Sequence, residues 1–387
     1  MIASQPYTDI ARPAVISTEE DLADWALSLI FRKGRLREPL PHSETAIKAI
    51  SDFCRRHLIS ATVLDALANS DSAADMIAAL TESMRKRGEY QKALHRQLAL
   101  AIAEIQPALD QEGISWRLMK GPTLQQDYYR TLTREYFDLD ILVPKEQFGR
   151  ARRVLARLGW HPHKRGFIPL RLLRGFEHGL GLKRGETIVD LHWSLRVRPA
   201  YRIDENRVFA RARSLHYAGV HVRALDAEYD LTLCLLSIAQ GIERDRVVLR
   251  DAIDLYLVLR SLDPIISWDT FFRERDREGI KRLCVSLLVA AVSWLDEESK
   301  LPNLRCELGR MGSRSLTEVN PLKNCLCLKN AKGAGRHWYL SVYHGGKGRY
   351  WLFTSMSVIL NQQFPYNLRR TFLWRRFMHG SHGKRSW

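Results

Sequence analysis

Apolar residues recur in the first part of the chain at intervals of three to four, which is the period of an amphipathic helix. The pattern is clear in residues 19–31 and 43–67, and it continues through residues 72–110. Gly88 lies inside the last segment and is a candidate break, whereas residues 111–113 end with a Gly, which commonly terminates a helix. The pattern therefore predicts two shorter helical segments followed by one long helix.

Short apolar runs replace the helical pattern after residue 113, which is typical of buried strands. Four strands are predicted, at residues 114–119, 137–143, 176–182 and 187–193. Helices are expected at residues 122–130, where Pro122 suits a first turn, and at residues 145–158. This succession predicts a small α+β unit of about 80 residues, with a mixed sheet and flanking helices.

Helical periodicity returns after residue 225, and four helices are predicted, at residues 228–242, 246–262, 268–277 and 280–298. Residues 303–349 are poor in pattern and rich in Gly, Lys and Arg, which indicates a loop or linker. The expected organisation is a helical N-terminal region at residues 1–73, an α+β core with its leading helix at residues 74–225, a helical domain at residues 226–302, and a linker with a basic aromatic C-terminal tail at residues 303–387.

The composition favours a folded protein with an anionic partner. Hydrophobic residues make up 45% of the 387 residues, which is enough for a sizeable core and excludes disorder of the whole chain. The formal net charge of +17 favours nucleotides, nucleic acid or an anionic membrane surface as partners. Residues 331–387 contain ten Lys and Arg and no Asp or Glu, so more than half of the net charge lies in this tail.

The sequence predicts a cytoplasmic protein. The N-terminal residues lack the basic start and apolar stretch of a signal peptide, and the longest mostly apolar run, residues 284–295, is shorter than the roughly 20 residues that cross a bilayer. The six cysteines form no C-x-x-C pair, so we expect reduced structural thiols rather than a zinc site. A peripheral location at the inner face of the membrane is the alternative if the tail binds lipid.

Three aspartates in apolar, strand-like runs are the candidate chemistry. Asp138 and Asp140 are two residues apart, so in a strand their side chains point to the same face. Two buried carboxylates on one face repel each other, and a divalent cation such as Mg²⁺ removes that conflict. Asp190 lies in a later run and would join them if the two strands are neighbours. Taken singly, Asp138 could instead cap a turn, and Asp140 could face solvent on an edge strand.

The order of these residues resembles that of a known family. The stretch LMKGPTLQQDYYRTLTREYFDLDILV, residues 118–143, is similar to the uncharacterised nucleotidyltransferase family of bacteria, within the DNA polymerase β-like nucleotidyltransferase superfamily. The resemblance covers residues 90–262 and rests on Lys120-Gly121, Arg134, Asp138-Leu139-Asp140, Asp190-Leu191-His192-Trp193 and a mid-helix Asp254. The chain departs from the usual pattern at Gly121-Pro122-Thr123, where the superfamily has Gly-Gly or Gly-Ser, and at Gln240, where family members often carry a His.

The resemblance implies a nucleotidyltransferase-type sheet and an Mg²⁺-dependent enzyme, with Mn²⁺ as the alternative ion. Such an enzyme moves a nucleoside monophosphate from an NTP, for example ATP, to an acceptor hydroxyl or phosphate. On this interpretation the three aspartates bind the metal ions and carry the catalysis. The residues expected to contact the nucleotide are Lys120, Gly121, Thr123, Arg134 and His192.

Some residues near these motifs have a plainer interpretation beside the functional one. His192 faces the same way as Asp190 in a strand, and it could bind phosphate or be a hydrogen-bonded core histidine. His178 could line the pocket from a neighbouring strand. Trp193 is expected in the core, and Asp254 is expected to serve helix packing or a salt bridge.

Two alternatives to an active enzyme remain open from the sequence. One is a catalytically weak nucleotide- or RNA-binding module of the same fold. The other concerns the tail, whose arginines and aromatic residues could bind nucleic acid, lie on an anionic membrane surface or dock on the helical domain. The acceptor, whether a small molecule, a protein or RNA, is not identified by any motif.

Overall fold

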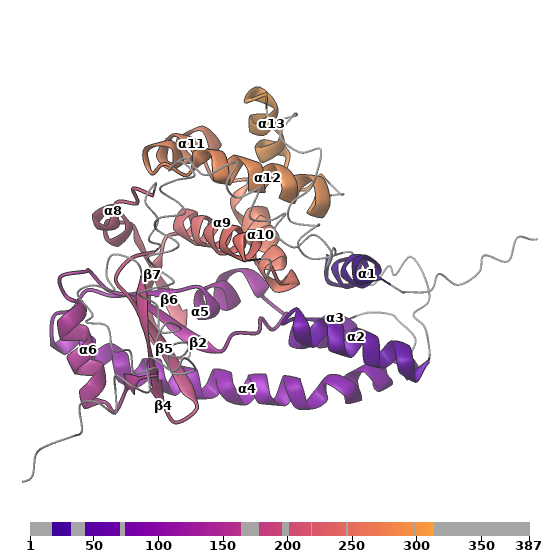
Figure 1. Ribbon diagram of the computed structural model, residues 1–387, viewed down its shortest axis with the longest axis horizontal. Coiled ribbons are helices and arrows are strands. Elements are labelled where there is room, and N and C mark those ends of the chain that lie inside the picture. The colour runs from indigo at the N-terminus through magenta and orange to yellow at the C-terminus, as the bar shows by residue number, and fades with distance from the viewer. Residues whose placement is uncertain are drawn as a thin grey trace, which may run out of the picture.

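A mixed sheet lies between two groups of helices in the computed structural model (Figure 1). The structure describes residues 18–31, 43–69, 74–163, 178–195, 201–217, 219–244, 247–296 and 299–312. The predictions for the basic aromatic tail fall outside these residues, except at residues 303–312. The fold is α+β, as expected, and within the described part no helix is long and apolar enough to cross a membrane.

Seven strands form one sheet in the order β3-β4-β5-β2-β1-β7-β6. Their bounds are Arg117–Met119 (β1), Asp138–Leu142 (β2), His161–Pro162 (β3), Gly179–Arg184 (β4), Thr187–His192 (β5), Ala212–Tyr217 (β6) and Val220–Leu225 (β7). β2 runs parallel to β5 and antiparallel to β1, and β1 runs parallel to β7. The sheet is therefore mixed, and its central strands β5, β2 and β1 are those that carry the candidate chemistry.

The β6–β7 hairpin was not predicted by the apolar pattern. Along both strands buried residues such as Leu215 and Val222 alternate with exposed polar ones such as Ser214 and Arg223. Only one face of this edge hairpin packs on the core, so no continuous apolar run marks it. The predicted strand at residues 114–119 is also shorter than expected, because regular pairing begins at Arg117.

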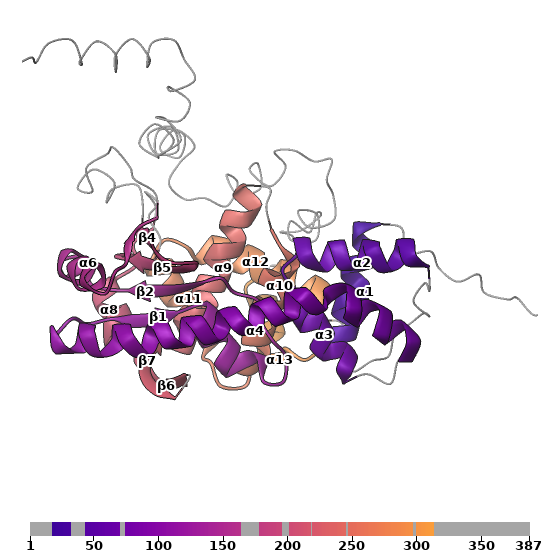
Figure 2. The same ribbon diagram turned by 90° about the horizontal axis from the view of Figure 1, so that it is seen from below.

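One long helix covers a face of the sheet. Helix α4 (Ala74–Gln111) lies along the sheet and continues to the N-terminal helices, as Figure 2 shows. Its residues Leu98, Ile102 and Ile105 are buried in one core with the sheet and with helix α6 (Phe148–Arg157). The expected break at Gly88 is wrong, since the helix is continuous there. A Cβ at Gly88 would lie 3.2 Å from the Leu64 side chain, so this glycine allows close helix packing.

The N-terminal helices are α1 (Glu19–Phe31), α2 (Glu44–Arg56) and α3 (Ser60–Ala68). The segment 43–67, which the pattern marks as one helical stretch, is divided at Leu58. This residue has a φ of 58°, a conformation that an α-helix cannot include. The division turns α3 back toward the core, where it packs on α4.

The helices after residue 225 agree closely with the prediction. They are α9 (Ala227–Glu243), α10 (Leu249–Leu262), α11 (Trp268–Arg277) and α12 (Lys281–Leu295), with the short α8 (Glu205–Ala210) before them. The expectation of a loop or linker from residue 303 is wrong at its start, because α13 spans Pro302–Arg310. Pro302 occupies the first turn of that helix, and Leu304 and Leu308 bury its inner face.

Candidate active site

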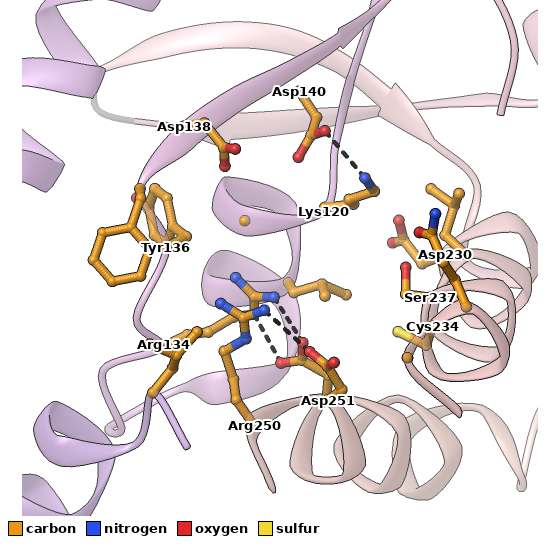
Figure 3. Close-up of a pocket in the computed structure, with 18 of the residues that line it drawn as sticks. Lys120, Arg134, Tyr136, Asp138, Asp140, Asp230, Cys234, Ser237, Arg250 and Asp251 are labelled. Carbon is orange, nitrogen blue, oxygen red and sulfur yellow. Dashed lines mark hydrogen bonds and ion pairs between the residues drawn. The ribbon is translucent and has the colours of Figure 1, made fainter. Parts of the chain in front are cut away.

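A cavity of about 450 Å³ lies where the central strands meet helices α9 and α10. Strands β2 and β5 contribute Asp138, Asp140 and Asp190 to its wall, and the turn after β1 contributes Lys120 and Gly121. The opposite wall consists mainly of polar and charged side chains of α9 and α10, as Figure 3 shows. The structure thus brings the three predicted carboxylates to one cavity.

Strand register explains how the carboxylates meet. In the parallel pair β2–β5, Asp140 lies directly opposite Asp190. Ligand atoms of Asp140, Asp190 and His192 all lie within 4.8 Å of one another, which is close enough to share one metal ion. Asp138 lines the same cavity but is not a member of this close group.

The carboxylates are not equally compensated. Burial raises the pKa of Asp138 to about 7, and the neighbouring Asp140 and Asp190 add to the shift. Burial and Asp140 also raise the pKa of Asp190. Burial opposes the charge of Asp140 as well, but Lys120 and the hydrogen bond from His192 outweigh it and lower the pKa of Asp140. Asp138 and Asp190 are thus less well compensated than Asp140, and their carboxylate oxygens fit a hard divalent cation.

His192 forms a hydrogen bond with Asp140 on the side away from the cavity. Its Nε2 lies 2.7 Å from Asp140 Oδ1, its side chain is buried, and it is not part of the cavity wall. His178 stacks on it with ring centroids 5.3 Å apart and also lies outside the wall. Trp193 is buried against Phe148, as expected of a core residue.

The turn after β1 holds Lys120 over the carboxylates. Lys120 has a φ of 51°, and its Nζ lies 3.1 Å from Asp140 Oδ1. The next residue must be small, since a Cβ on Gly121 would lie 2.8 Å from the ring of Tyr136. Thr123 is fully buried and donates its hydroxyl to the Lys120 carbonyl, so the predicted contact of Thr123 with a nucleotide finds no support in this geometry.

Arg134 lies at the cavity, but its charge is already matched. Its guanidinium makes two bonds to Asp254, of 2.7 and 2.6 Å, and Tyr129 donates to the same carboxylate. The structure confirms the salt-bridge interpretation of Asp254. Both bonds engage the Arg134 guanidinium, and its contact with phosphate stays a prediction.

Arg250 is a cation at the cavity that the sequence analysis missed. It stands at the start of α10 and donates to the Asp251 carboxylate and to the Glu135 carbonyl. The backbone of α10 is fixed there by His57, whose Nδ1 accepts from Leu249 N–H and whose carbonyl accepts from Arg250 N–H. No pattern in the sequence marks Arg250, since its position depends on contacts with the distant N-terminal helices.

Helix α9 provides the other missed residues. Asp230, Cys234, Ser237 and Gln240 are spaced by three or four and line the cavity together. Polar residues that recur with this spacing in an otherwise apolar helix were the available signal. Among the described residues, Cys54, Cys234, Cys284 and Cys306 form no disulfide, and the first three of them are buried.

Comparison with known proteins adds a family match. The sequence model of a family described as "Uncharacterised nucleotidyltransferase" matches residues 43–296, from the start of α2 to the end of α12. No curated protein matches the chain.

Three solved structures are similar over part of the chain. The solution structure of the antibiotic-resistance factor ANT(2'')-Ia is 15% identical, with a TM-score of 0.30 over 56% of this chain and 94% of that one. The crystal structure of ANT(2'')-Ia with adenylyl-2''-tobramycin is 18% identical, with a TM-score of 0.33 over 46% and 95%. An antigenic nucleotidyltransferase-like protein from Paracoccidioides brasiliensis is 16% identical, with a TM-score of 0.27 over 49% and 91%.

The tight contact at Gly121 gives a first prediction. Gly121→Ala places a methyl group against the buried Tyr136 ring, and we expect a loss of about 1–3 kcal/mol in unfolding free energy. The matched control is Gly149→Ala in α6, where the added Cβ meets nothing within 4 Å; it should gain about 0.5–1 kcal/mol, because alanine favours a helix. Urea denaturation measures both changes, and a shift of the same sign in the two variants would contradict the contact.

The Arg134–Asp254 pair gives a second prediction. Arg134→Met leaves a buried carboxylate without its cation, and we expect a loss of about 3–5 kcal/mol. The double variant Arg134→Met/Asp254→Leu removes both charges and should recover most of that stability. Thermal and urea unfolding of the single and double variants test this. A double variant as unstable as the single one would show that the pair is not the cause.

Proposed function

We infer that this chain, which belongs to the uncharacterised nucleotidyltransferase family, transfers a nucleoside monophosphate from an NTP to an acceptor hydroxyl or phosphate. The observation that supports the proposal most directly is the group of carboxylates on β2 and β5, which face a cavity with Lys120 beside them. A cavity of about 450 Å³ is in the range of small-molecule sites.

In this proposal Asp138, Asp140 and Asp190 hold Mg²⁺ or Mn²⁺. When bound, such ions polarise a phosphoryl group and stabilise the charge that develops during its displacement. The donor set fits, because the carboxylates carry more negative charge than the nearby cations balance. His192 holds Asp140 in place through their 2.7 Å hydrogen bond and keeps its carboxylate ionised.

The remaining groups would bind the triphosphate and move a proton. Lys120 has 27% of its side chain exposed and can turn from Asp140 to a phosphate, while Arg250 and the Gly121 backbone face the same space. Asp190, with its raised pKa, is suited to accept the proton of the acceptor hydroxyl as its oxygen attacks the α-phosphorus. The bond from that phosphorus to pyrophosphate breaks in the same displacement.

A catalytically weak binding module would retain the fold without this chemistry. Keeping three acids around one cavity has an electrostatic cost, which favours a site that uses them. Catalysis is therefore favoured over nucleotide binding alone.

Nucleotide binding is the third prediction and the test of this proposal. Calorimetry with the four NTPs and Mg²⁺ should show metal-dependent binding of at least one NTP by the wild type. Asp138→Asn/Asp140→Asn should weaken that binding by at least about tenfold, because two metal ligands are lost. Asp276→Asn, which removes an exposed acid on α11, is the control and should bind like the wild type. A folded wild-type protein that binds no NTP would contradict the proposed transferase function.

The raised pKa of Asp138 gives a fourth prediction, on the metal-free protein. Asp138 favours its protonated form in the folded state, so its contribution to stability is complete below pH 3.8, the ordinary pKa, and is lost as the pH rises through about 7. In the presence of EDTA, the melting temperature of the wild type relative to Asp138→Asn should therefore fall between pH 5 and pH 8. Mn²⁺ at pH 8 should restore it. A difference in melting temperature between the two proteins that does not change with pH would contradict the raised pKa of Asp138.

A further inference from the structure

Asp230 is a buried acid that the proposed chemistry does not use. It lies on α9, it is 1% exposed, and its carboxylate faces the cavity across from β2 and β5 (Figure 3). Its Oδ2 accepts from Arg213 at 2.7 Å and from Tyr128 at 3.3 Å. Its Oδ1 has no hydrogen-bond partner among the described residues, although a buried carboxylate oxygen normally has one.

The charge around Asp230 is also unbalanced. On the same wall, Asp254 is paired with Arg134 and Asp251 with Arg250, one arginine for each acid. Asp230 must instead share Arg213 with Asp127, which contacts the same guanidinium. Two acids and one arginine leave one negative charge in excess beside the cavity. Burial raises the pKa of Asp230 to about 6 despite Arg213, so at pH 8 this charge is present.

The cavity wall formed by α9 is therefore polarised along its length. Asp230 stands near the start of the helix and Arg244 follows its end, and both line the cavity. The two residues are fourteen positions apart in sequence, which corresponds to roughly 21 Å along a helix. A triphosphate is attracted toward Arg244 and Arg250 and repelled by Asp230, which leaves the Asp230 end for the second substrate.

We propose that Asp230 binds a protonated amine of the acceptor substrate. This inference rests on the proposed transferase function and names the class of acceptor. An ammonium group donates to the unpartnered Oδ1 and also neutralises the excess charge, whereas a neutral hydroxyl would provide only the hydrogen bond. An RNA end would bring phosphates toward the acid and fits less well. Because a protonated amine is not a nucleophile, the group that attacks phosphorus is another group of the same molecule.

The test uses spermidine as the amine probe and 1,8-octanediol as a neutral probe of similar length. Calorimetry at pH 8 with excess Mg²⁺, which occupies the carboxylates of β2 and β5, should show saturable binding of spermidine to wild type at one site. Asp230→Asn should weaken it by at least about tenfold, since a charged hydrogen bond is lost. Asp276→Asn should bind spermidine as wild type does, and octanediol should not bind. Spermidine binding that is absent, or equal in Asp230→Asn and wild type, would overturn the proposal.

Asp127→Asn tests the charge balance without changing the cavity wall. It releases Arg213 to neutralise Asp230 fully, so spermidine binding should weaken by about two- to fivefold. Asp127 is partly exposed, and this variant is expected to fold even if Asp230→Asn does not. Unchanged binding in Asp127→Asn would contradict the argument from charge.

Binding of Mg²⁺ and NTP to the same proteins separates this inference from the transferase proposal. Asp230→Asn should bind NTP at least as tightly as the wild type, which also shows that it is folded. Spermidine binding that depends on Asp230 in a protein without NTP binding would support the amine site and refute the transferase. If the proteins bind NTP, but Asp230→Asn binds spermidine as tightly as the wild type does, the amine site alone would be refuted.

Discussion

Repulsion between carboxylates on two adjacent strands is the constraint around which the site is organised. The parallel register of β2 and β5 places Asp140 opposite Asp190, and the alternation of side chains adds Asp138 to the same wall. Buried like charges at this spacing are unfavourable unless cations or hydrogen-bond donors compensate them. Lys120 and His192 compensate Asp140, so the imbalance that remains is localised at the other two acids. A site with this residual charge is prepared for a cation before any substrate arrives.

The segment that leads into β2 is held on several sides, which keeps this arrangement rigid. Arg134 bonds to Asp254 on α10, and the next residue, Glu135, accepts from Ala61 N–H on α3 and from Arg87 on α4. Tyr136 then packs against Gly121. Each of the three successive residues is thus fixed by a different element, and Asp138 follows two residues later. Such support from outside the site is what holds reactive groups in position.

The sequence predicted the parts of the molecule in which local pattern and final structure coincide. The apolar runs of β2 and β5 and the helical period of α9 to α12 report burial directly, so their positions agree with the structure. The β6–β7 hairpin and the division at Leu58 escaped prediction, because one has a single buried face and the other is a single-residue backbone conformation. For the site, the carboxylates and Lys120 were placed correctly at one cavity, while their roles stay predictions. Arg134 and Thr123 were predicted to contact the nucleotide from their positions in the motif alone. In the structure Arg134 pairs with Asp254 and Thr123 donates to the Lys120 carbonyl, and no motif indicates either contact.

The contact between His57 and the start of α10 has a consequence for how the protein can be divided. A shortened chain that begins at α4 would retain the sheet with its carboxylates, and by sequence it would look like a complete catalytic unit. It would lack the groups that accept the first N–H bonds of α10 and the backbone contact that anchors the segment before β2. The N-terminal helices are therefore better regarded as structural support for the cavity than as an appendage. This agrees with the family match, which begins at residue 43 rather than at the sheet.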